Sequence, residues 1–211
     1  MIEHVKPADI EKRSFEIISE ILRETGKELD PENELVIKRV IHTSADFEYA
    51  DNLVFSEHAV TKGIEAIKSG CDIVTDTQMA KWGVSKTTLA RLGGEVHCFI
   101  ADPDVAAEAK ERGVTRAVVS MEKAAKLDKP CIFAIGNAPT ALIRLKELIE
   151  EGAFRHEPPL VIGVPVGFVN VVESKEMFLD CSVPYIIARG RKGGSNVAAA
   201  ICNALIYQIT R

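Results

Sequence analysis

The stretch "CIFAIGNAPTALIRLKELIEEG", residues 131–152, joins a short apolar run to a helical pattern through a turn that contains Gly and Pro. The apolar run has almost no polar alternation, which is typical of a strand buried on both faces of a parallel sheet. The helical pattern repeats its apolar residues at a spacing of three or four and ends at Gly152. Strand, turn and helix in this order indicate an α/β fold.

Similar apolar runs alternate with helical segments through the rest of residues 71–211. We predict five parallel strands within one three-layer α/β sandwich, covered by helices on both faces. The sequence has no internal repeat or Pro/Gly-rich linker, so one domain over residues 1–211 is expected. The predicted strands cover residues 72–76, 95–100, 130–136, 160–165 and 184–189.

The first 70 residues have a different pattern, with three helical segments over residues 7–26, 31–47 and 56–70. Pro7 and Pro31 occupy first-turn positions, where the missing N–H of proline does no harm. Ser56 is the expected N-cap of the third helix. We therefore expect residues 1–70 to form a helical extension packed on the α/β core of residues 71–211.

Composition restricts the possible partners and the location of the chain. A net charge of −5, with both signs interspersed, argues against a nucleic-acid ligand. No apolar run approaches the length of a membrane span, and the first residues lack the pattern of a signal peptide. The five cysteines are widely spaced and mostly adjoin apolar runs, as expected of buried thiols. We expect a cytoplasmic protein without membrane contact.

Unusual turns follow four of the predicted strands, at residues 75–79, 136–140, 165–168 and 189–196. In parallel sheets, ligands bind beyond the carboxyl ends of the strands, where these turns would gather. The turns "GNAPT" and "PVGF" place Gly and Pro where a flat ligand could approach the backbone, but ordinary turns have the same composition.

The turn "GRKGGSN", residues 190–196, is the strongest candidate for an anion site. Gly193 and Gly194 allow backbone N–H groups to approach a ligand, and Ser195 or Asn196 would cap a helix whose N-terminus favours anions. Arg189, Arg191 and Lys192 add positive charge. A Gly-rich turn with solvated basic side chains is the alternative, and an anion site is the favoured interpretation. The turn is neither a Walker A loop nor a GxGxxG fingerprint, so nucleotide binding is not specifically indicated.

His42 stands near the expected end of the second helix, in "VIHTSADFEYADNL", residues 40–53. Most histidines in such positions cap or pack. On a continuing helix, however, Asp46 would share a face with His42 and orient its imidazole, while Lys38 and Arg39 would lower the pKa of the ring. Opposed shifts of the histidine pKa, from the carboxylate on one side and the cations on the other, suit a proton donor near neutral pH.

Other kinds of catalytic site lack support in the sequence. His4, His58, His97 and His156 have no comparable neighbours and are interpreted as structural. No GxSxG elbow, HExxH motif or His/Cys cluster is present, so covalent and metal catalysis are not indicated. We expect no metal and no cofactor.

Five motifs resemble the precorrin-8X methylmutase family, which includes the cobalt-precorrin-8 enzymes. The resemblance extends from Ser14 to Leu205. The motifs are "RVIHTSADFEYADNLVFS", "IVTDTQM", "IGNAPTAL", "VIGVPVGFVNVVESKE" and "GRKGGSNVAAAICNAL".

The resemblance implies a flavodoxin-like homodimer and an isomerase of cobalamin biosynthesis. The reaction moves a methyl group from C-11 to C-12 of a contracted tetrapyrrole and yields hydrogenobyrinate, or cobyrinate from a cobalt-loaded substrate. It also implies that His42 protonates a ring nitrogen to favour a 1,5-sigmatropic shift, and that Ser14 and Arg39 contact the substrate. Such a polycarboxylate needs basic clamps and Gly-rich walls, for which Arg189, Arg191, Lys192, Gly193 and Ser195 are the candidates.

Two other functions remain as alternatives. A tetrapyrrole carrier would keep the pocket without catalysis, and a flavodoxin-like protein could bind a nucleotide or flavin at the "GRKGGS" turn. Turnover distinguishes the carrier from the enzyme, and flavin absorbance would support the third possibility.

Overall fold

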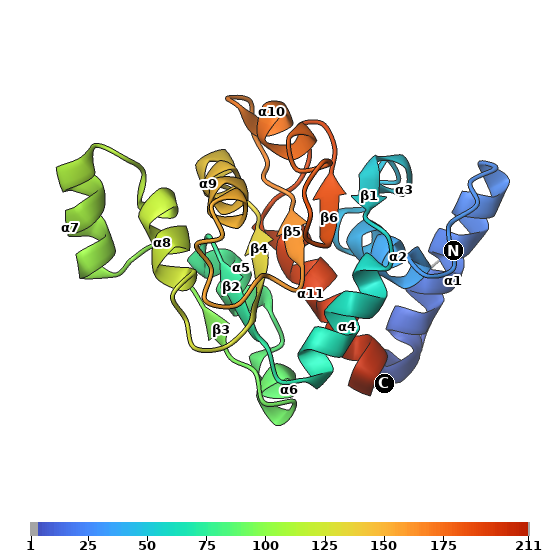
Figure 1. Cartoon of the computed structure of the whole chain (residues 1–211). Coiled ribbons are helices and arrows are strands. Elements are labelled where there is room, and N and C mark those ends of the chain that lie inside the picture. Colours follow the sequence, from blue (N-terminus) through green and yellow to red (C-terminus); the bar gives the residue numbers. More distant parts are fainter. Residues whose placement is uncertain (1–3, 211) are drawn as a thin grey trace.

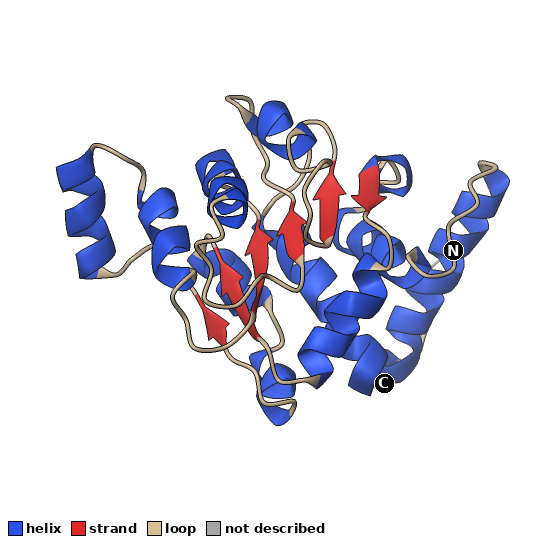
Figure 2. Cartoon of the chain, in the orientation of Figure 1, coloured by secondary structure: helices blue, strands red, loops and turns tan. Residues whose placement is uncertain are grey.

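A six-stranded, mostly parallel sheet forms the centre of the molecule (Figures 1 and 2). The computed structural model describes residues 4–210. The strand order is β1-β6-β5-β4-β2-β3, and all neighbouring strands are parallel except β1 and β6. The strands are β1 (Leu53–Phe55), β2 (Asp72–Thr75), β3 (Val96–His97), β4 (Cys131–Ile135), β5 (Val161–Gly163) and β6 (Tyr185–Ala188).

Successive residues of the strands face two different helical layers. In β4, Ile132 and Ala134 belong to one apolar core, while Phe133 and Ile135 belong to the other. Every residue of β2, β4 and β5 is buried. The absence of polar alternation in the sequence therefore reflects burial on both faces, as predicted.

One helical layer is built by α11 (Ser195–Thr210), α2 (Glu34–Ser44) and α4 (Ala59–Lys68), with α1 (Ile10–Glu24) packed outside α2. The other contains α8 (Arg116–Ala124) and α9 (Pro139–Glu150), with α7 (Pro103–Arg112) packed on α8. Helices α1 and α7 lie at opposite ends of the molecule (Figure 1). The shorter helices are η1 (Pro7–Asp9), α3 (Tyr49–Asn52), α5 (Gln78–Gly83), α6 (Lys86–Arg91) and α10 (Val171–Glu176). Within residues 4–210, no helix is long and apolar enough to cross a membrane.

The five predicted parallel strands are confirmed, and the sheet has a sixth strand that was not predicted. Strand β1 pairs antiparallel with β6, and Figure 2 shows their arrows pointing in opposite directions. The third N-terminal helix begins at Ala59 instead of near Ser56. Ser56 caps no helix, because its hydroxyl accepts a hydrogen bond from the backbone N–H of Tyr185 (2.9 Å) and so extends the β1–β6 pairing.

Leu142 tests how much stability the second core provides. Its side chain is 0% exposed and packs between α9 and the sheet. We expect Leu142→Ala to lower the free energy of unfolding by about 2–5 kcal/mol. Ile10→Ala, at a position that is 52% exposed, should cost less than about 1 kcal/mol. Urea titration of both variants measures the difference, and equal losses would contradict the assigned core.

Candidate active site at the carboxyl ends of the strands

His42 lies in the last turn of α2, on the side turned away from the core. Val36, Ile37, Val40 and Ile41 form the buried side of the helix, so the next position is exposed. The imidazole stacks on the ring of Phe15 from α1, with centroids 5.6 Å apart and planes 23° apart. The histidine is thus accessible to a ligand while one face of its ring is supported.

The expected helical partnership between Asp46 and His42 is wrong. Helix α2 ends at Ser44, and Ala45 adopts a left-handed conformation (φ 54°), so Asp46 does not continue the helical face. The Asp46 carboxylate accepts a hydrogen bond from Lys192 Nζ (2.6 Å), and this ammonium lowers the pKa of the carboxyl. Asp46 joins the end of α2 to the Gly-rich turn.

Arg39 lies one helical turn before His42 and has a largely buried side chain. Its Nη2 donates to Glu11 Oε1 (2.7 Å), and its guanidinium lies between the rings of Phe15 (4.8 Å) and Tyr207 (5.3 Å). Pairwise ring and cation–π contacts therefore link His42, Phe15, Arg39 and Tyr207 across α2, α1 and α11, and these four residues together are called the stacked column. Lys38, the other expected cation, pairs with Glu34.

A groove of about 430 Å³ lies beside this column. It is lined by Glu11, Phe15, Leu35, Arg39, Ala204, Tyr207 and Gln208. Ser14, which precedes Phe15 in α1, donates its hydroxyl to the carbonyl oxygen of Ile10 (2.9 Å).

The Gly-rich turn connects the end of β6 to the start of α11. Arg189 makes two hydrogen bonds to Glu176 (2.9 and 2.6 Å), and Lys192 pairs with Asp46 and Glu48 (2.6 and 2.9 Å). These carboxylates raise the pKa values of both basic side chains. Two of the three expected clamps are therefore already neutralised by the chain itself.

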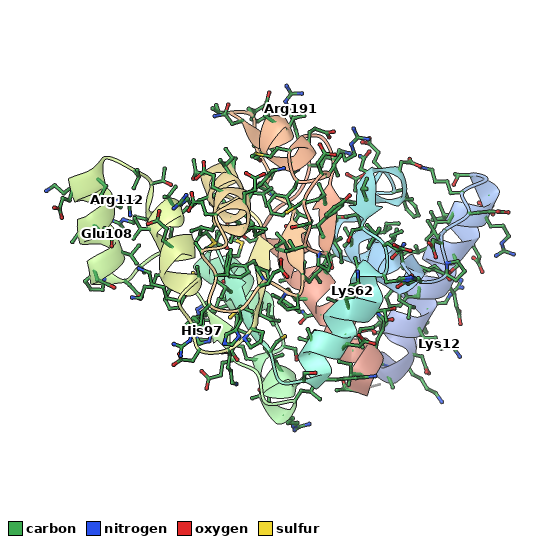
Figure 3. All side chains as sticks on the ribbon, viewed as in Figure 1. Lys12, Lys62, His97, Glu108, Arg112 and Arg191 are labelled. Atoms are coloured by element: carbon green, nitrogen blue, oxygen red, sulfur yellow. The ribbon has the colours of Figure 1, made fainter. Side chains whose placement is uncertain are left out.

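Arg191 is the exception among the basic side chains of this turn. Within residues 4–210 its guanidinium makes no hydrogen bond or ion pair, and it is exposed. Figure 3 shows Arg191 at the outer edge above the strand ends, with His97 far away at the lower edge. Arg191 is thus available to an anion that approaches this edge.

Close backbone contacts bring the loops after β2, β4, β5 and β6 together. A Cβ atom at Gly193 would lie 2.1 Å from the carbonyl oxygen of Val164, and one at Gly136 would lie 2.7 Å from Cα of Ser195. The Ser195 hydroxyl is 2.7 Å from that of Thr77, which caps α5. Glycine at 136 and 193 is therefore required by packing.

The Asp76 side chain occupies the backbone N–H groups of the turn after β4, where a flat ligand was considered from the sequence. Its buried carboxylate accepts hydrogen bonds from the N–H groups of Gly136, Asn137 and Ala138 (2.9, 2.8 and 2.7 Å). Burial raises the pKa of this carboxyl, while the three hydrogen bonds oppose the shift. These amides are not available to a substrate carboxylate.

Lys175 is a further residue of this region that the sequence did not predict. It belongs to α10, is 0% exposed, and donates to the carbonyl oxygens of Gly190 (2.8 Å) and Lys192 (2.9 Å). Burial lowers the pKa of its amine to about 8. The short pattern "VVESKE" gives no sign of this, because a lysine between two glutamates is typical of an exposed helix. For Asp76, a carboxylate directly after an apolar strand was a usable signal.

The sheet order and the placement of these loops define a class of protein. The parallel strands follow the order of flavodoxin-like folds, with the switch point between β2 and β4. A basic, Gly-rich turn lies at the carboxyl edge, and its Lys192 binds Asp46, which follows the end of the helix that carries the exposed His42. The molecule is a flavodoxin-like α/β protein with an exposed arginine in the Gly-rich turn at its carboxyl edge.

Comparison with known proteins identifies the family. Residues 9–208 match the family model described as "CbiC: Precorrin-8X methylmutase". The cobalt-precorrin-8 methylmutase of Salmonella typhimurium is 47% identical over 210 residues, covering 97% of this chain and 96% of that protein. The chain belongs to the precorrin-8X methylmutase family.

Two further comparisons agree with this assignment. The precorrin-8X methylmutase of Pseudomonas aeruginosa is 39% identical over 208 residues, covering 97% of this chain and 98% of that protein. The crystal structure of precorrin-8X methylmutase from Thermus thermophilus has a TM-score of 0.84 at 38% identity. The structural match covers 96% of this chain and 98% of the Thermus thermophilus chain.

Asp76 provides a test of how the strand-end loops are held. Asp76→Asn keeps the shape but turns amide hydrogens toward backbone N–H groups, leaving at least one donor unpaired. We expect a loss of about 1–3 kcal/mol and a melting temperature lower by about 2–4 °C per kcal/mol. The matched control is Asp104→Asn, which alters an exposed ion pair with Lys123 and should cost under about 1 kcal/mol. Equal melting temperatures for the two variants would contradict the assigned role of Asp76.

Proposed function

We propose that the chain is a methylmutase that moves a methyl group from C-11 to C-12 of precorrin-8 or cobalt-precorrin-8. The observation that carries the proposal is the match along nearly the whole chain to proteins named cobalt-precorrin-8 and precorrin-8X methylmutases. The products would be hydrogenobyrinate and cobyrinate, respectively. The reaction is intramolecular, so the protein has to supply orientation and a proton, without a methyl donor or a hydride acceptor.

We propose His42 as the proton donor. Imidazole is the side chain most often used for proton transfer near neutral pH, and His42 is exposed and stacks on Phe15, which lines the groove. Protonation of a ring nitrogen, expected on ring C, would draw electron density from the macrocycle and favour the 1,5-shift of the methyl group. After the shift, the ring nitrogen returns the proton to the His42 imidazole, which regains its starting form.

Arg191 is the proposed first contact for the substrate carboxylates. Its guanidinium has the planar donor geometry that carboxylates accept, and no described carboxylate occupies it. Arg39, Arg189 and Lys192 already pair with acidic side chains, so they would bind substrate by sharing or exchanging those partners. Gly193, Ser195 and Ser14 would contribute backbone and hydroxyl contacts around the ring.

We also propose a homodimer in the cytoplasm, as the family resemblance implies. Large apolar side chains are exposed on the loop after β5 and on α5, and a second copy of the chain is the occupant expected to cover them. These residues are Met79, Trp82, Phe168 and Val169. The five cysteines are free, which supports a reducing compartment.

His42→Ala tests the catalytic proposal. The variant should retain folding and substrate binding but lose about 10²–10⁴-fold in kcat, because the proton donor is removed. Conversion is followed by the absorbance change of metal-free and cobalt-loaded substrate in separate assays. The matched control is His58→Ala, at an exposed histidine of the α4 N-terminus that pairs with Glu32.

The control variant should convert substrate at the wild-type rate. Undiminished turnover by His42→Ala would exclude His42 as the proton donor. Binding without any turnover by the wild-type protein would indicate a tetrapyrrole carrier.

The dimer has its own measurement. Light scattering after size exclusion should give about twice the chain mass of 23.1 kDa. Phe168→Asp should shift the equilibrium toward the monomer, since a charge would enter an apolar contact. A wild-type monomer at micromolar concentration would contradict the proposal.

A further inference from the structure

Lys175 is a fully buried ammonium group in a protein where the other basic side chains of the site are at least partly exposed. It projects from α10 into the space below the turn of residues 189–194, and both of its hydrogen bonds go to that turn. Removing an ammonium group from water is costly, and an apolar side chain of similar volume would avoid the cost. The ammonium charge therefore contributes through the two backbone carbonyl groups that it binds.

The two carbonyl groups held by Lys175 belong to the residues on either side of Arg191. The carbonyl oxygen of Arg191 itself accepts from the backbone N–H of Gly167 (3.2 Å). Residues of α10 and of the loop before it thus donate hydrogen bonds to three successive carbonyl groups, those of residues 190, 191 and 192. The conformation needs such support, because Gly190 has a φ of +77° and Gly193 abuts Val164.

The neighbour of Lys175 in α10 holds the same turn from outside. Glu176 makes two hydrogen bonds to the Arg189 side chain. Side chains of two adjacent residues in α10 therefore bind three residues of the turn. The Arg191 side chain is exposed, while the carbonyl groups of residues 190, 191 and 192 are all held by hydrogen bonds.

We propose that Lys175 is a positioning residue for substrate binding, which fixes the backbone at 190–192 so that Arg191 meets a carboxylate of the tetrapyrrole. This inference rests on the proposed function. Lys175 does not touch the substrate itself, since its side chain has no exposed surface. Its effect is exerted through the orientation of Arg191. It also acts through the backbone of Lys192, which is followed by Gly193 and Gly194 just before α11 begins.

Lys175→Met is the direct test, with hydrogenobyrinate and cobyrinate as the binding probes. The variant leaves two carbonyl groups without their donor, so the turn relaxes and the pre-organised position of Arg191 is lost. We expect Kd, measured by absorbance titration, to rise about 10-fold, which corresponds to about 1.4 kcal/mol. The value of kcat at saturating substrate should change by less than about 3-fold, because the proton donor is untouched.

Lys146→Met is the matched control. Lys146 is a largely buried lysine of α9 that also donates to a backbone carbonyl, that of Met177 beyond the end of α10. It does not contact the 189–194 turn. A general loss of support around α10 would weaken binding in both variants, whereas the proposal predicts a changed Kd in Lys175→Met alone.

A double-mutant cycle with Arg191→Ala tests whether Lys175 acts through Arg191. Both single variants should weaken binding, and Lys175→Met should add less than about 3-fold in the Arg191→Ala background. Full additivity, or a wild-type Kd in the folded single variant, would overturn the inference. If Lys175→Met fails to fold, Lys175→Gln takes its place with a smaller expected rise in Kd, and a wild-type Kd there has the same meaning.

The result is separable from the proposed function. If the wild-type protein neither binds the two products nor converts the substrates, the methylmutase proposal fails. If the wild-type protein is active and the cycle is additive, the role of Lys175 alone is rejected.

Discussion

Burial of the parallel strands on both faces is the constraint from which the arrangement of the site follows. Since β2, β4 and β5 are covered by helices on both faces, the chain can leave the sheet only at the amino and carboxyl ends of these strands. Each crossover returns through a helix, so every parallel strand presents its carboxyl end at the same edge. Loops that are 60 to 120 residues apart in sequence therefore meet there, as the contacts of Asp76 with Gly136 and of Thr77 with Ser195 show.

Polar groups that gather at this edge are largely satisfied by one another. Asp76 occupies three backbone N–H groups, Lys175 holds two carbonyl groups, and Lys192 joins the end of α2 to the turn after β6. Each of these hydrogen bonds restricts the conformation of the loop that it holds, and pre-organisation reduces the entropy lost on binding. This internal pairing also leaves few unpaired charges, which fits a chain whose net charge is −5 and whose proposed ligand is a polyanion. The guanidinium of Arg191 and the imidazole of His42 are among the polar groups that remain exposed.

Local patterns in the sequence predicted most of the fold and only part of the site. The five parallel strands and the long helices followed from apolar runs and from Pro and Gly at element boundaries, which are local signals. Strand β1 was missed because three residues acquire a strand conformation only through pairing with β6, which is more than 130 residues away. The position of Asp46 was predicted wrongly because the left-handed Ala45 ends α2, and alanine gives no signal for such an ending. Lys175 could not be recognised, since burial of a lysine depends on the distant turn that accepts its hydrogen bonds. The family resemblance supplied what local patterns could not, namely the substrate class and the expected substrate contacts of Ser14 and Arg39, whereas His42 was already a candidate from its local pattern.

The central claim is that His42 and the turn of residues 189–195 form one site for a tetrapyrrole at the carboxyl edge of the sheet. A crystal structure of the wild-type protein with bound hydrogenobyrinate tests it most directly. The account predicts that the macrocycle lies across the strand ends, with a His42 ring nitrogen within hydrogen-bond distance of the ring and with Arg191 on a peripheral carboxylate. A ligand bound at the opposite edge, near His97 and Asp72, or held at a distance from His42, would contradict it.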